Sequence, residues 1–263
     1  MPAPLTRYLS RYADLAPDEC RAVEGLTNIA MRSVKARRDI FREGDACSTV
    51  SILVSGWACQ SKLTESGSRQ IISFVLPGEM CDAQAHLLGV RDTTINTLTD
   101  VKLITIRADV YEGLTERYPR IALALRRAEA FTLAATRERL LSIGRRPAYA
   151  RLGLLFTDLM ARAKRAGVGD GRSCEFPLRQ IDLADACGLT PVHINRTLQD
   201  MRRAGVIELS TRRLSILRPQ ELRFMSVFAQ AAAADPHNEA AIDVGVPPDP
   251  APLHARPTFS LFG

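Results

Sequence analysis

Two segments in the second half of the chain have the apolar spacing of short α-helices. In the segment 178–187, Leu183 and Cys187 are four residues apart, which places them on one face of a helix. In the segment 190–203, apolar residues follow at i, i+4 and i+7, namely Ile194, Leu198 and Met201. Each segment therefore predicts an amphipathic helix that turns one face toward a common core.

The residues between these two helices predict an abrupt turn. Gly188 can adopt the positive φ that ends a helix, and Thr190 followed by Pro191 is a favourable start for the next one. A helix, a short glycine turn and a second helix with a polar outer face predict a helix-turn-helix. An ordinary helical hairpin in a protein core is the alternative interpretation of the same pattern.

Two further features favour a DNA-binding unit over a plain hairpin. The apolar runs 206–209 and 214–217 have strand length and enclose the basic turn 210–213, which predicts a β-hairpin wing. Residues 145–220 contain 14 Arg and Lys against 7 Asp and Glu, whereas the whole chain has 35 against 29. Basic charge concentrated in this region is what binding to DNA phosphates requires.

The first half of the chain has a different period. Residues 1–31 are expected to be helical, with one helix opening at Pro17. From residue 34 onward, short apolar runs at 40–41, 50–54, 71–76 and 101–106 alternate with turns that contain glycine. Runs of this length with turns between them predict antiparallel β-structure, as a barrel or a sandwich.

A long helical stretch at 109–143, with a break near Tyr118 and Pro119, joins the two parts. Its second half repeats apolar or small residues at alternating steps of four and three, which is typical of a coiled-coil pair. We therefore predict a dimer interface formed by Ile121, Leu125, Ala128, Thr132 and Ala135. The alternative is that this helix packs on the β-structure of its own chain.

The order of these elements resembles one known family. The motif FREGD at 41–45, Gly56, Gly67 and LPGE at 76–79 are similar to the β-roll of the Crp/Fnr superfamily of bacterial regulators. The winged helix-turn-helix that follows is similar to the C-terminal domain of that family, and the resemblance covers about residues 30–220. It implies an α+β fold with an N-terminal antiparallel, jelly-roll-like β-roll, a long dimerisation helix and a C-terminal winged helix-turn-helix.

The same resemblance implies a function. We expect a transcription regulator that binds a palindromic operator as a homodimer, with a DNA affinity modulated through the β-roll. If it is an activator, RNA polymerase is a further expected partner. The alternative is a cyclic-nucleotide-binding-like signalling adaptor without direct DNA function, which the helix-turn-helix and its basic charge disfavour.

The predicted domain boundaries lie at residues 118, 146 and 220. Residues 1–118 form the N-terminal helix and the effector domain, and 119–146 form the dimerisation helix and the hinge, which starts at Gly144 and ends at Pro147, where the next helix begins. Residues 147–220 form the DNA-binding domain. The extension 221–263 is rich in Ala and Pro, which predicts a mostly disordered tail.

Roles in DNA binding follow from position on the helix-turn-helix. We expect base edges to be contacted by Pro191, Val192, Asn195 and Arg196. We expect phosphates to be contacted by Arg179, Gln180, Thr190, His193, Arg202, Arg212 and Arg213. Arg196 suits guanine, whereas Pro191 and Val192 suit thymine methyl groups. Two alternatives stay open: Asn195 could reach a phosphate, and Arg202 could be a solvated surface charge.

The effector is not identified by the sequence. Matching by spacing to the cyclic-AMP receptors places Ala83 where their ribose-binding Glu lies and Thr93 where their phosphate-binding Arg lies, although Arg91 is close. Cyclic AMP bound in the usual mode is therefore not expected. An iron–sulfur cluster needs four thiolates, and the cluster-bearing branch of the family that this chain resembles has three of them closely spaced near the N-terminus. Only Cys20 lies there in this chain, so a cluster is not expected. His86 alone does not indicate haem.

Other classes of function find no support in the sequence. It has no GxSxG, HExxH or Walker motif, so we expect no catalytic residues and no enzymatic activity. The six cysteines are scattered without a CxxC pair, which suits reduced thiols in the cytoplasm and predicts no metal site. No apolar run approaches the length of a membrane span, and the first residues lack the apolar region of a signal peptide.

Overall fold

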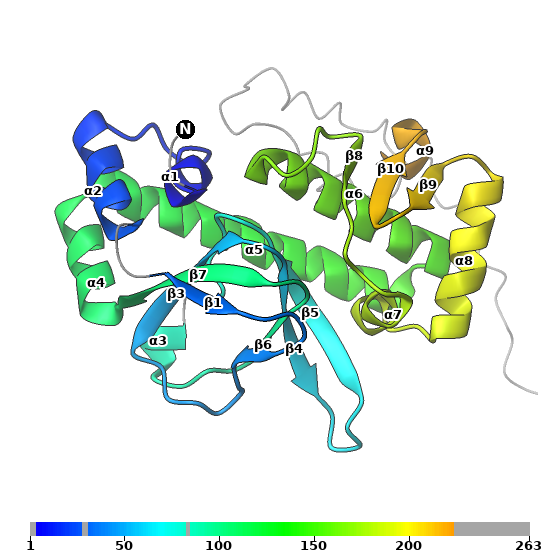
Figure 1. Ribbon diagram of the computed structural model, residues 1–263, viewed down its shortest axis with the longest axis horizontal. Coiled ribbons are helices and arrows are strands. Elements are labelled where there is room, and N and C mark those ends of the chain that lie inside the picture. Colours follow the sequence, from blue (N-terminus) through cyan, green and yellow to red (C-terminus); the bar gives the residue numbers. More distant parts are fainter. Residues whose placement is uncertain (1–3, 28–30, 83–84, 224–263) are drawn as a thin grey trace, which may run out of the picture.

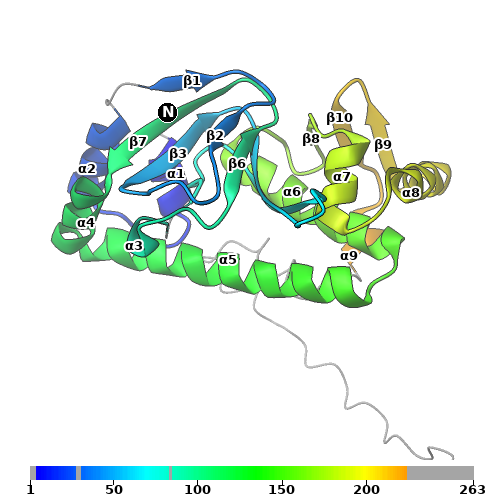
Figure 2. The ribbon, with the colours of Figure 1, turned by 90° about the horizontal axis from the view of Figure 1, so that it is seen from below.

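The computed structural model of the chain describes residues 4–27, 31–82 and 85–223. These residues form a β-rich N-terminal domain and a smaller C-terminal domain, with one long helix running along both (Figures 1 and 2). The predicted tail lies outside the described residues, apart from its first three positions, which belong to a short helix.

The N-terminal domain is an antiparallel β-roll, as predicted. Two sheets with the orders β1-β7-β3 and β2-β6-β4-β5 contain only antiparallel pairs. The strands are β1 (Arg32–Val34), β2 (Asp39–Phe41), β3 (Thr49–Ser55), β4 (Ala58–Leu63), β5 (Arg69–Val75), β6 (Thr94–Thr97) and β7 (Val101–Arg107). Helices α1 (Pro4–Leu9) and α2 (Pro17–Thr27) precede the strands, and α3 (Ala85–Leu88) and α4 (Ala108–Arg117) complete the domain.

Three of these strands were not predicted from the pattern of apolar runs. Strand β4 reads ACQSKL and buries Ala58, Cys59 and Ser61, which are small side chains rather than large aliphatic ones. Strands β1 and β6 are only three and four residues long. Such strands are recruited by pairing with stronger neighbours, which a sequence window does not contain.

Helix α5 (Pro119–Arg145) begins at the predicted break, with Pro119 in its first turn. Gly144 and Arg145 continue this helix, so the link to the next helix is shorter than the predicted hinge and consists of Arg146 and Pro147. Figure 2 shows α5 extending from the β-roll to the C-terminal domain. Helix α5 therefore forms the covalent connection between the β-roll and the C-terminal domain.

The first half of the predicted dimer interface belongs to the core of its own chain. The side chains of Ile121, Leu125 and Ala128 are 0%, 4% and 3% exposed and pack in one cluster with residues of α1 and β3, such as Leu5 and Val50. These three residues are therefore covered by their own chain and are not exposed toward a second one. The heptad spacing shows only that this face is apolar, and here it faces the β-roll.

The C-terminal domain is a winged helix-turn-helix, as predicted. It contains α6 (Ala148–Ala166), β8 (Ser173–Glu175), α7 (Gln180–Cys187), α8 (Pro191–Arg203), β9 (Ile207–Ser210), β10 (Arg213–Ile216) and α9 (Pro219–Arg223). Its three strands pair in the order β8-β10-β9. One apolar cluster crosses the domain boundary, because Trp57 and Phe74 of the β-roll belong to the same cluster as Phe156 and Leu183.

Within the described residues, no helix is both long enough and apolar enough to span a bilayer.

Candidate nucleic-acid interface

Helix α8 is fixed by its inner face and its start. Ile194, Leu198 and Met201 are fully buried in the domain core, as their spacing predicted. Gly188 ends α7 with a φ of 61°, which a residue with a side chain adopts only with strain. The Thr190 hydroxyl then accepts a hydrogen bond from the backbone N–H of His193 at 3.3 Å and caps α8. The helix therefore presents a defined face to solvent.

The outer face of α8 begins with two apolar residues and continues with polar ones. Pro191 and His193 are exposed, and Val192 has 80% of its surface in solvent although it is a large aliphatic residue. One turn later, Asn195 and Arg196 are exposed as well. The Gln199 amide donates to the side-chain oxygen of Asn195 at 3.0 Å, so these two amides form one polar unit that was not predicted.

Most of the predicted phosphate ligands are exposed to solvent. Arg179 and Gln180 lie at the start of α7, Arg202 lies in the last turn of α8, and Arg212 lies in the turn of the wing. Within the described part of the chain, the guanidinium groups of these three arginines make no ion pair, and neither does that of Arg196. Cations without a carboxylate partner are free to bind anions.

Arg213 is the exception among the predicted phosphate ligands. Its guanidinium donates to the hydroxyl of Ser173 and lies 4.0 Å from the Asp170 carboxylate. These contacts tie strand β10 to the loop before β8 inside the domain. The Arg213 guanidinium is thus partly engaged in contacts within its own domain. Its position beside Arg212 in the sequence did not indicate these contacts.

The wing is a tight hairpin with an unusual turn. Thr211 and Arg212 have φ values of 43° and 61°, the left-handed conformation that two-residue hairpin turns require. The backbone N–H of Phe176 donates to the Arg212 carbonyl at 2.6 Å and anchors the turn to the segment after β8. The hairpin lies beside α8 (Figure 1), and its strand β9 is in contact with that helix.

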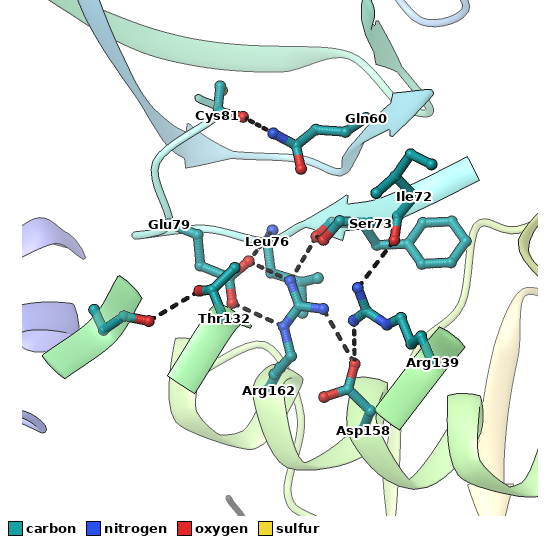
Figure 3. Close-up of polar contacts among 12 residues, drawn as sticks. Gln60, Ile72, Ser73, Leu76, Glu79, Cys81, Thr132, Arg139, Asp158 and Arg162 are labelled. Carbon is teal, nitrogen blue, oxygen red and sulfur yellow. Dashed lines mark hydrogen bonds and ion pairs between the residues drawn. The ribbon is translucent and has the colours of Figure 1, made fainter. Parts of the chain in front are cut away.

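A polar cluster joins the β-roll to helices α5 and α6 (Figure 3). The Arg162 guanidinium forms ion pairs with Glu79, at 2.5 Å, and with Asp158, at 3.2 Å. Arg139 of α5 pairs with the same Asp158 at 2.9 Å and donates to the Ile72 carbonyl at 3.0 Å. Burial alone would raise the pKa of Asp158, but Arg162 and Arg139 outweigh it and hold the pKa below its usual value.

A cavity opens beside this cluster, between the β-roll, α5 and α6. Its lining includes Gln60, Ser73, Glu79, Thr132 and Arg162. Figure 3 shows Gln60 hydrogen-bonded to the Cys81 carbonyl and Thr132 bonded within its own helix. The polar groups that face the cavity are thus largely engaged with the protein itself.

The segment after the LPGE turn contains a buried ion pair. Arg91 pairs with Asp82, and both side chains are nearly inaccessible to solvent. The Arg91 guanidinium also stacks 3.5 Å from the centre of the Phe41 ring. Arg91 is therefore used inside the domain, while Ala83 lies outside the described residues and Thr93 is buried.

The cysteines are buried thiols, apart from the half-buried Cys20. Burial raises the pKa of Cys59, Cys81 and Cys187 to about 12 and that of Cys174 to about 11. These four thiols are protonated at neutral pH and poorly nucleophilic. In the described residues, no group of three or more His, Cys, Asp or Glu lies close enough together to hold a metal ion.

Comparison with known proteins gives the same two-domain division. A cyclic nucleotide-binding domain family matches residues 31–118, and a Crp-like helix-turn-helix domain family matches residues 150–225. The nitrogen fixation regulation protein FixK of Rhizobium meliloti is 31% identical over 193 residues, which cover 72% of this chain and 83% of that protein. The chain belongs to the Crp/Fnr superfamily of transcription regulators.

Two further relatives support this assignment. FixK of Azorhizobium caulinodans is 29% identical over 220 residues, which cover 82% of this chain and 88% of that protein. The solved structure of FixK2 from Bradyrhizobium japonicum has the same fold, with a TM-score of 0.64 at 21% identity, and the match covers 75% of this chain and 96% of that one. This Crp/Fnr regulator therefore shares both domains with its relatives.

The regulator also contains a charged contact between its domains that sequence reasoning missed. Arg37 donates to both carboxylate oxygens of Asp182 at 3.0 and 2.9 Å, and Arg69 bonds to Asp182 at 2.9 Å and to Asp185 at 2.7 Å. We call these four residues the α7 clamp. An Asp three residues after Arg179 does suggest a helix cap, but nothing in the sequence connects position 182 with positions 37 and 69.

Proposed function

We propose that this regulator binds a palindromic operator as a homodimer and reads each half-site with α8. The supporting observation is the exposed start of α8, which carries apolar and hydrogen-bonding side chains and Arg196, a residue that makes no ion pair within the described part of the chain. A helix of this kind fits the major groove, where base edges carry a distinct donor and acceptor pattern. Because operator DNA lies in the bacterial cytoplasm, we also propose that the regulator acts there.

The proposed contacts divide into base readers and phosphate ligands. Arg196 reads a guanine through its two parallel N–H groups, and Asn195, supported by Gln199, contacts a neighbouring base. Pro191 and Val192 pack against thymine methyl groups. The phosphate backbone is held by Arg179, Gln180, Thr190, His193, Arg202 and Arg212, with a weaker share for Arg213.

The dimer is proposed to form through the face of α5 that points away from the β-roll. Leu123, Ala130, Leu133 and Leu140 are exposed on this face at steps of seven, three and seven residues. This is coiled-coil spacing, and Leu140 has 74% of its surface in solvent. A second copy of the same helix would cover these leucines and place two copies of α8 on one side of the dimer.

We also propose that an effector acts through the β-roll. Cyclic AMP in the usual mode does not fit this proposal, because Arg91 is already paired with Asp82. A contact with RNA polymerase follows if the regulator is an activator. Neither proposal requires a catalytic residue.

Selection of binding sites from a random DNA library tests the central proposal. The expected result is a palindrome whose half-sites contain one fixed guanine and thymine-rich neighbours, bound by a dimer. A double variant with Leu133→Asp and Leu140→Asp should be a monomer by light scattering and should bind this palindrome far more weakly. Recovery of sites without symmetry, or tight palindrome binding by a monomeric variant, would contradict the proposal.

A further inference from the structure

The α7 clamp joins the β-roll to the first helix of the helix-turn-helix. Arg37 lies in the turn between β1 and β2, and Arg69 is the first residue of β5. Their common partner, Asp182, has a side chain with 0% of its surface exposed. Asp182 also accepts the backbone N–H of Arg179 at 3.0 Å, so one carboxylate both caps α7 and holds it to the β-roll.

The clamp is neutral and shielded. Two arginines face two aspartates, and each arginine side chain is 28% exposed while Asp185 is 16% exposed. Burial alone would lower the pKa of Arg69, but its hydrogen bonds to Asp185 and Asp182 outweigh it and raise the pKa. Arg69 therefore remains charged at neutral pH.

Apolar contact between the domains cannot replace this clamp. The shared cluster around Phe74 and Leu183 favours association, but apolar burial has no preferred direction. Hydrogen bonds from a guanidinium to a carboxylate are directional and fix both distance and angle. The clamp thus determines how α7 is rotated on the β-roll.

A second attachment lies at α6, the helix that follows the link formed by Arg146 and Pro147. Figure 3 shows Arg162 of α6 bonded to Glu79 and Asp158. One attachment at α6 would still let the helix-turn-helix pivot about it, whereas a second one at α7 removes that freedom. The recognition face stays open, since Val192 and Arg196 are exposed while the clamp is closed.

We infer that Arg37 and Arg69 are positioning residues for operator binding, which set the orientation of α8 through Asp182 and Asp185 without touching DNA. This inference rests on the proposed binding of a palindrome by a dimer. Two recognition helices that are held at one separation meet two half-sites without further loss of freedom. Without the clamp, the DNA-binding domain would have to become ordered when it binds DNA, which lowers the affinity. It would also accept half-sites at other separations.

The test uses the full-length protein and the palindrome that the wild type selects, together with versions in which the centre is one or two base pairs shorter or longer. Each added pair moves the half-sites by about 3.4 Å and rotates them by about 36°. For the wild type, affinity should fall steeply away from the selected spacing. For the double variant Arg37→Ala, Arg69→Ala, the best affinity should fall about 10–100-fold and the differences between spacings should shrink.

Binding to a single half-site separates positioning from loss of fold or of base contacts. It should be the same for the wild type and the double variant. If the double variant does not fold, Asp185→Ala removes one bond of the clamp and leaves the cap at Asp182 intact, and it should flatten the spacing preference in part. The control Arg42→Ala removes an exposed arginine that pairs with Asp39 inside the β-roll and should change nothing.

The possible results are distinct. A folded clamp variant that keeps the wild-type affinity and the wild-type spacing preference would overturn the inference. A wild type without any spacing preference would instead overturn the proposed palindrome binding by a dimer. A flattened preference with unchanged half-site binding supports both.

Discussion

The hydroxyl of Thr190 accepts a hydrogen bond from the backbone N–H of His193, three residues further along α8. This bond occupies one of the free N–H groups at the start of a helix, and Pro191 has no N–H to satisfy. The same turn carries the residues that we propose to face the bases. A well-ordered first turn of α8 should therefore favour both the stability of the domain and the recognition of DNA bases.

Replacing Thr190 by Ala should lower the free energy of unfolding by about 1 kcal/mol, because the cap is lost. Thr190→Ser keeps the hydroxyl and should stay close to the wild type. Urea unfolding without DNA measures this effect apart from any phosphate contact. Thr136→Ala is the matched control, since that hydroxyl donates to the Thr132 carbonyl within α5. Equal stability of Thr190→Ala and the wild type would show that the cap contributes nothing.

Replacing Arg196 by Ala should remove the preference for one guanine in each half-site. The expected loss is about 1–3 kcal/mol of discrimination, with non-specific binding almost unchanged. Competition binding against half-sites with each base at that position measures it. Arg203→Ala is the control on the same helix, because Arg203 is exposed and pairs with Asp200. An Arg196→Ala protein that still prefers the guanine would show that another residue reads it.

Replacing Arg212 should weaken binding to all DNA sequences alike. Arg212→Asn is the better variant, since Asn tolerates the φ of 61° at this position more readily than Ala does. The slope of log affinity against log salt should become shallower by about one, because one phosphate contact is lost. Titrations at several salt concentrations, with Arg42→Ala as the control, measure the slope. A change in the preferred sequence would instead place Arg212 at a base.

The sequence predicted the local parts of this structure well because local rules determine them. Gly188, Thr190 and the spacing of Ile194, Leu198 and Met201 each act within a few residues, and each has the predicted role in the fold. The wing and the break at Pro119 follow from equally local signals. The assignments to bases and phosphates stay predictions, since they concern DNA.

The relations between distant segments could not be predicted in the same way. Helix α5 has two apolar faces, and only the folded chain shows that Ile121 faces the β-roll while Leu133 and Leu140 face solvent. Likewise, Asp185 has the appearance of a solvated helix residue until Arg69, 116 positions earlier, is placed beside it. Pairings of this kind depend on the topology of the β-roll and have no periodic signature.

Asp158 offers a test of the junction between the domains by pH. Its pKa is lowered in the folded state, since Arg162 and Arg139 outweigh the effect of burial. A lowered pKa contributes stability that is present above the unfolded pKa of about 3.9 and is lost as the pH falls through the folded pKa. The contribution should therefore be constant between about pH 5 and pH 8 and disappear in acid.

Asp158→Asn removes the charge while keeping the shape of the side chain. At pH 7 the variant should unfold with a free energy about 1–3 kcal/mol lower than that of the wild type, because both guanidinium groups lose an ionic partner. Below about pH 4 the difference should narrow, because the carboxyl of the unfolded wild type then takes up a proton and the folded one follows at lower pH. Asp109→Asn is the control, because that exposed pair with Arg107 is open to solvent. A difference of the same size at pH 7 and at pH 3 would mean that the charge of Asp158 does not stabilise the junction.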